Sequence, residues 1–151
     1  MLIRPVTKEE RLQSAQLLTI ESGELTISAA DDAIHCDYTL QIGAEGTDGP
    51  AILITDCDEG LEAAALHVAS GDIRIRASDD CLNAANSDLS GFDFSMDISG
   101  GTISAYTTDG DGFDSNGSMT ISGGTPPEKP DGGTPPERPD NASEPPEPGN
   151  L

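Results

Sequence analysis

The sequence has few aromatic residues, little positive charge and no long apolar run. Of 151 residues, 3% are aromatic and none is tryptophan, while seven Lys and Arg oppose 28 Asp and Glu, for a net charge of −21. A charge this negative argues against nucleic acid and anionic membranes as partners, and it favours cations. No stretch of 18 apolar residues exists, so we expect no membrane insertion.

Apolar residues are also scarce at the C-terminal end. Residues 124–151 hold nine of the eleven prolines and six acids against two bases. This composition predicts a disordered linker or tail that carries −4 of the charge and leaves −17 for the rest. We therefore expect an N-terminal cap over residues 1–22, a repeat domain over residues 23–123, and a Pro-, Gly- and Glu-rich tail over residues 124–151.

What is present is a short acidic turn that recurs four times. Each copy reads acid, small, large apolar, polar, small, and a further acid lies just upstream. The copies begin at Asp32, Glu59, Asp80 and Asp111, which are 27, 21 and 31 residues apart. Repeats of roughly 20–50 residues are typical of stacked coils that bury their faces on their neighbours.

Short stretches of alternating apolar and polar residues flank each turn, and glycine-rich corners separate them elsewhere. The alternation predicts strands with one buried face, and glycine permits the left-handed backbone of tight corners. We expect an all-β fold, a right-handed parallel β-helix of about four coils. A β-sandwich is the alternative, but it does not explain why the turn recurs in the same phase. For the cap, residues 7–18 predict a short helix that begins with a capping box.

Stacked coils would place like residues about 5 Å apart in columns. Ile34, Leu61, Leu82 and Phe113 would form a buried column, whereas the acids would form columns of mutually repelling carboxylates. Calcium takes six to eight oxygen ligands and suits such a site. Although one Asp turn could serve only to bond backbone amides, four in register favour calcium. The predicted ligands are Asp31, Asp32, Asp58, Glu59, Glu62, Asp79, Asp80, Asn83, Asp109, Asp111 and Asp114.

Two further features concern the same columns. His35, Glu62, Asn83 and Asp114 would form a second polar column, in which His35 occupies a ligand position. The densest cluster, residues 109–114, resembles part of an EF-hand loop, but it lacks the terminal glutamate and has strands in place of helices.

The three cysteines, Cys36, Cys57 and Cys81, lie near the turns. Their odd number argues against a disulfide framework, and none is spaced like a zinc ligand. We expect small, partly buried residues, with a single bridge between neighbouring coils left open.

No catalytic residue is predicted, because no Ser-His-Asp or Cys-His arrangement emerges from the spacing. A lyase would need a base to abstract a proton from an acidic sugar. Arg74 and Arg76 are the only permanently basic residues of the repeat region, and both read as surface residues. The candidates for glycan contact are Tyr38, Tyr106, Arg74 and Arg76.

The segments 31–35, 59–62, 78–84 and 109–118, with Gly-Gly-Thr-Pro-Pro-Glu-Lys-Pro-Asp in the tail, resemble the clostridial-type carbohydrate-binding β-helix domains of bacteria. The likeness covers about residues 23–135. It implies a right-handed parallel β-helix shaped like pectate lyases, with bound Ca²⁺ and affinity for plant-type polysaccharides such as cellulose or pectin. It also implies a secreted or cell-surface protein, of which this chain, lacking a secretion signal, would be a fragment.

The sequence thus predicts a non-catalytic, calcium-dependent polysaccharide-binding module. Two alternatives stay open: a lyase-like enzyme, and a structural or adhesive rod that binds calcium but no glycan. The exposed end coils of a short β-helix could also pair with a second copy, which makes a homo-oligomer an expectation.

Overall fold

A computed structural model describes residues 12–14 and 16–124, and all their regular secondary structure is β-strand. Most of the predicted tail, the first eleven residues of the predicted cap, and residue 15 lie outside the described residues.

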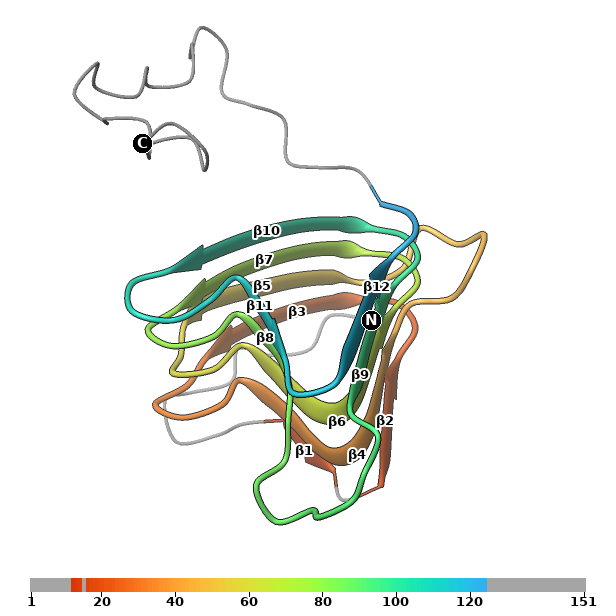
Figure 1. The fold of residues 1–151 in the computed structure, drawn as a ribbon. Helices are drawn as coiled ribbons and strands as arrows, with labels where there is room; N and C mark the ends of the chain where they lie inside the picture. Colours follow the sequence, from red (N-terminus) through yellow and green to blue (C-terminus); the bar gives the residue numbers. More distant parts are fainter. Residues whose placement is uncertain (1–11, 15, 125–151) are drawn as a thin grey trace, which may run out of the picture.

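The strands form two parallel sheets that enclose an apolar core (Figure 1). Sheet A has four strands in the order β10-β7-β5-β3. Sheet B has eight, because the long strands β4 and β6 are matched in the other coils by pairs of shorter strands. The strands of sheet A are β3 (Glu24–Ser28), β5 (Ala51–Asp56), β7 (Asp72–Ala77) and β10 (Thr102–Thr107). Those of sheet B are β1 (Leu12–Ser14), β2 (Leu17–Ile20), β4 (Ile34–Ile42), β6 (Leu61–Val68), β8 (Leu82–Ala84), β9 (Ser95–Ile98), β11 (Phe113–Ser115) and β12 (Ser118–Ile121).

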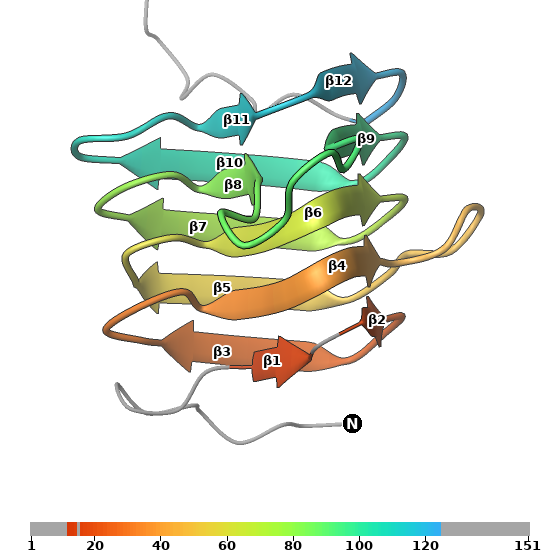
Figure 2. The same cartoon turned by 60° about the horizontal axis from the view of Figure 1, so that its bottom comes forward.

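The chain winds from sheet B through a glycine corner to sheet A, and then through an acidic turn to sheet B of the next coil (Figure 2). Every strand pair is parallel and joins one coil to the next. This architecture is a parallel β-helix of about four coils, which confirms the predicted fold class and rules out the β-sandwich.

The core consists of apolar columns that run from coil to coil. Leu40, Leu66 and Met96 are aligned in successive strands, and each has 0% of its surface exposed. The predicted column of large apolar turn residues is likewise in register: three of its members are fully buried, and Phe113 in the last coil is partly buried. In the alternating stretches of the sequence, the apolar residues therefore point into the core and the polar residues point to the outer faces of the two sheets.

Glycine is required at the corners opposite the acidic turns. Gly71 has a φ of 126° and Gly101 a φ of 87°, values that L side chains rarely adopt. A Cβ on Gly101 would also lie 3.0 Å from the carbonyl oxygen of Gly71 in the coil below. The predicted glycine corners are confirmed.

The helix predicted over residues 7–18 is wrong in its described part, where strands β1 and β2 occur. Leu12–Ser14 pairs with Ile34–Cys36, and Leu17–Ile20 pairs with Thr39–Ile42. The exposed edge of β4 offers backbone partners that a local capping box cannot match, so tertiary pairing overrides the helical pattern.

Candidate metal centre

The acidic turns stack along one edge of the β-helix, between the two sheets (Figure 2). The backbone N–H of Asp58 donates to the carbonyl of Asp31 at 3.1 Å, and that of Asp79 donates to Asp58 at 2.9 Å. In the fourth turn the backbone N–H of Asp109 donates to the carbonyl of Ser78 at 3.0 Å, so this acid is displaced by one residue from the column. The predicted columns are therefore real neighbours in space.

The second polar column runs along the outer face of sheet B. His35 of β4, Glu62 of β6, Asn83 of β8 and Asp114 of β11 are partners in register. Each follows an apolar residue of the buried column, of which Phe113 is only partly buried, so the pleat turns its side chain away from the core. The segment between β8 and β9 then passes in front of β6 (Figure 2). Its Asn86 donates a hydrogen bond to the carbonyl of Asp37, which helps to enclose this column.

His35 lies among three carboxylates. Its Nδ1 is 3.3 Å from Oδ2 of Asp32 and 2.7 Å from Oε1 of Glu62, while its Nε2 is 2.9 Å from Oδ1 of Asp37. The neighbouring carboxylates, Asp32 first and then Glu62, raise the pKa of His35 from 6.5 to about 10. Without a metal, this imidazolium supplies the positive charge that the carboxylates require.

Glu59 lies deeper in the same cluster. Burial, together with its contact to Glu62, raises the pKa of Glu59 well above its usual range. Asn83 Nδ2 donates to Glu59 Oε1 at 3.3 Å, and Asn83 is only 7% exposed. Asp32, His35, Glu59, Glu62 and Asn83 are named the inner cluster here.

A second group of acids lies at the outer rim of the third and fourth turns. Asp79, Asp80, Asp109 and Asp111, named the outer cluster, surround Gly110 and its neighbours. A Cβ on Gly110 would collide with the backbone carbonyl carbon of Asp79 and would lie 2.6 Å from a carboxylate oxygen of both Asp79 and Asp80, so this position requires glycine. The Asp80 carboxylate accepts the Asp111 N–H at 2.7 Å.

The carboxylates of the outer cluster lie close enough to repel one another. The charge of Asp80, with smaller contributions from Asp58, Asp109 and Asp111, raises the pKa of Asp79. Asp58 is partly satisfied, because its Oδ1 accepts the Ser78 hydroxyl at 2.6 Å. The outer cluster offers oxygen ligands only, which fits a hard ion such as calcium, whereas the inner cluster adds an imidazole nitrogen.

The predicted glycan-contact residues fall on two different faces. Arg74, Arg76 and Tyr106 share the outer face of sheet A, where Arg76 lies 5.0 Å from the centre of the Tyr106 ring. Tyr38 instead lies on β4 in sheet B and makes an edge contact with Phe92, with the ring centres 6.1 Å apart. The four residues therefore cannot form one binding surface.

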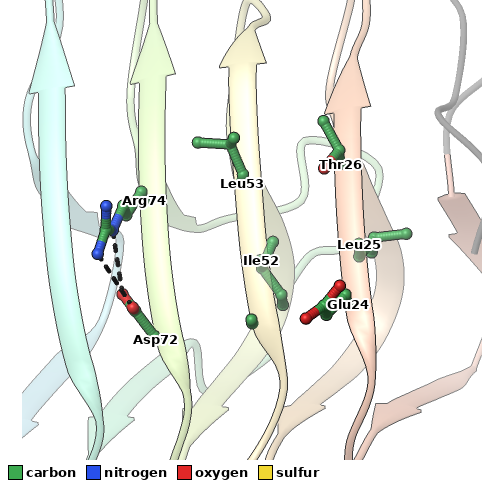
Figure 3. Close-up of a pocket in the computed structure, with 8 residues that line it drawn as sticks. Glu24, Leu25, Thr26, Ile52, Leu53, Asp72 and Arg74 are labelled. Carbon is green, nitrogen blue, oxygen red and sulfur yellow. Dashed lines mark hydrogen bonds and ion pairs between the residues drawn. The ribbon is translucent and has the colours of Figure 1, made fainter. Parts of the chain in front are cut away.

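Sheet A also carries a shallow pocket of about 220 Å³ on its outer face (Figure 3). Ala51 lies in register between Glu24 and Asp72, and its small side chain leaves a depression between them. Leu53 forms part of the lining, as does Arg74, whose guanidinium is held by Asp72 at 3.2 Å. Sequence reasoning did not find this pocket, because the alignment of Glu24, Ala51 and Asp72 depends on the exact coil lengths.

Comparison with family models, curated proteins and solved structures found no match for this chain. The resemblance to clostridial-type carbohydrate-binding domains therefore stays a prediction. Within residues 12–14 and 16–124, no helix has the length and apolar character needed to cross a membrane.

Proposed function

We propose that the chain is a non-catalytic polysaccharide-binding module of the β-helix type, in which calcium binds at the outer cluster. The observation that carries this proposal is the stacking of acidic turns from successive coils along one edge. The coils cannot separate these charges, because backbone hydrogen bonds fix the turns in register.

Calcium matches the outer cluster in charge and in ligand type. The raised pKa of Asp79 reports repulsion from neighbouring carboxylates, which a divalent ion would relieve. Carboxylates and turn carbonyls supply the oxygen atoms that calcium coordinates. Bound calcium would therefore stabilise the folded state, since the unfolded chain holds no such cluster.

The outer face of sheet A is our candidate for glycan contact. Leu53 is 43% exposed and Tyr106 is 55% exposed, so both offer apolar surface to the face of a sugar ring. Glu24, Asp72 and Arg74 lie beside Leu53 and can hydrogen-bond to sugar hydroxyl groups. A neutral plant-type polysaccharide suits this face directly, whereas an anionic one such as pectin would need calcium as a bridge. Such polymers lie outside cells, which is consistent with a secreted or cell-surface protein.

No described residue favours the lyase alternative. Arg74 is engaged by Asp72, and Arg76 stacks on Tyr106. The structural rod differs from our proposal only in glycan binding, so a retention experiment separates the two.

The test is retention on cellulose and on polygalacturonate, with calcium and with chelator. The two tyrosines provide a matched pair of variants, because they lie on different sheets. Tyr106→Ala should weaken retention roughly three- to tenfold, since an aromatic contact contributes about 0.5–1.5 kcal/mol. Tyr38→Ala should retain wild-type binding. Absence of retention on both polymers would favour the rod, and ultraviolet-absorbing unsaturated products would favour a lyase.

A further inference from the structure

We propose that Asp32, His35 and Glu62 form a separate site for a transition-metal ion of the Zn²⁺ class. The site lies in the inner cluster and does not depend on calcium at the outer cluster or on glycan binding. An imidazole nitrogen suits zinc and its neighbours in the first transition row, whereas calcium prefers oxygen alone.

The three side chains converge with one ligand atom each. These atoms all lie within 4.8 Å of one another. Nδ1 of His35 is 3.3 Å from the Asp32 carboxylate and 2.7 Å from the Glu62 carboxylate. Ligands around a tetrahedral zinc ion are separated by about 3.4 Å, because each bond is about 2.1 Å long. Small side-chain adjustments would therefore bring all three atoms to bonding distance.

The second nitrogen of His35 is already oriented by a carboxylate. Nε2 lies 2.9 Å from Asp37 Oδ1, and the backbone carbonyl of Asp37 is held in turn by Asn86. Histidines that bind metals commonly donate their other ring N–H to a carboxylate, which fixes the tautomer and directs the free nitrogen at the ion. Here that arrangement leaves Nδ1 for the metal.

Unsatisfied buried atoms point independently to a ligand. Among the described residues, three buried side-chain atoms have no hydrogen-bond partner, and all three belong to the inner cluster: His35 Nδ1, Glu59 Oε2 and Asn83 Oδ1. His35 Nδ1 is close to Glu62, but this contact is an ion pair without hydrogen-bond alignment. Asn83 is 7% exposed and is the register partner of Glu62, so this buried residue is a neighbour of the proposed site. Buried polar atoms rarely stay unpaired, and a bound ion would satisfy them.

The charge around the site suits a cation. Asp32, Glu62 and Asp37 face the His35 ring, and Glu59 interacts with Glu62. A divalent ion bound at Nδ1 would offset the negative charge of these carboxylates.

The test is titration of the intact chain with ZnCl₂ by calorimetry, with Co²⁺ absorption as a spectroscopic probe. We expect one equivalent of Zn²⁺, bound at least tenfold more weakly by His35→Gln, and a cobalt spectrum that this variant loses. His67→Gln is the matched control: His67 faces one carboxylate, Asp97, at 3.3 Å, and should leave zinc affinity unchanged. Asp79→Asn should also leave it unchanged, which separates this site from the calcium proposal.

A direct measurement on the wild-type chain covers the case in which His35→Gln fails to fold. In ¹⁵N spectra of the imidazole rings, Zn²⁺ should shift Nδ1 of His35 and leave His67 in place. An unshifted His35 under saturating zinc would mean that the cluster is an ion pair only, and the proposal would fall. Displacement of Zn²⁺ by an equal concentration of Ca²⁺ would also overturn it.

Discussion

Replacing His35 with glutamine removes the one positive charge that the structure places among Asp32, Asp37 and Glu62. In the folded, metal-free protein these carboxylates raise the pKa of His35 from 6.5 to about 10. Taken alone, that shift corresponds to about 5 kcal/mol of stability. Because the ring is partly solvated and water screens its charge, we expect roughly 2 kcal/mol.

The pH dependence gives this prediction its sign. A group whose pKa is higher in the folded state stabilises that state fully below its unfolded pKa, and the effect is lost as the pH rises through its folded pKa. The free energy of unfolding of the wild-type protein should therefore exceed that of His35→Gln by roughly 2 kcal/mol at pH 6. This difference should decline as the pH rises from 6.5 and should be lost by about pH 10.

Urea denaturation in EDTA at pH 6, 8 and 10 measures this difference, and EDTA keeps the cluster free of metal. His67→Gln is the control, because His67 pairs with the exposed Asp97 at 3.3 Å; its free energy of unfolding should stay within about 0.5 kcal/mol of the wild-type value. Equal stability of His35→Gln and wild type at pH 6 would refute the reasoning. A deficit that stayed constant from pH 6 to pH 10 would also refute it, since the effect would then come from packing.

Two further predictions concern the core and the thiols. Leu66→Ala, in the middle of a buried column, should lower the free energy of unfolding in urea by about 3–4 kcal/mol. Met119 in the last coil is 42% exposed, so Met119→Ala should lower the free energy of unfolding by less than about 1 kcal/mol. Equal losses in Leu66→Ala and Met119→Ala would contradict the assignment of Leu66 to a buried apolar column. Burial raises the pKa of Cys57 to about 12 and also raises that of Cys81, so both thiols should resist a disulfide reagent at pH 8 until urea is added. Fast labelling of the native protein would contradict this burial.

The register of the β-helix could be predicted because each coil repeats the same order of residue types. Ile34, Leu61, Leu82 and Phe113 can be aligned from the sequence alone, and the strands pair at these residues. The acid columns follow from the same alignment, because the turns are fixed to the strands that follow them.

The additional segments of the coils could not be placed from the sequence. The shortest step, 21 residues, is a bare coil, and the longer steps contain the loop at residues 43–50 and the segment at residues 85–94. Tyr38 contacts Phe92 of the second segment, and Asp37 is held by Asn86. The unequal steps indicate that insertions exist, but the surface that an insertion covers depends on tertiary contacts.

The environment of His35 could be predicted only in part. Its place in the polar column follows from the repeat, whereas its position between Asp32 and Asp37 depends on side-chain directions at the start of β4. The predicted helix failed for a related reason, since pairing with a neighbouring coil outweighs a local sequence pattern.

The most direct test of the account is a calcium titration followed by thermal and urea unfolding. At a free calcium concentration of about 100 times Kd, the free energy of unfolding of the wild-type protein should rise by about 2.7 kcal/mol, and chelator should reverse this increase. The Asp79→Asn/Asp111→Asn double variant should lose this gain, whereas Asp48→Asn, an exposed acid in the loop at residues 43–50, should keep it. An unchanged wild-type transition, or an equal gain in the double variant, would contradict calcium binding at the stacked acidic turns.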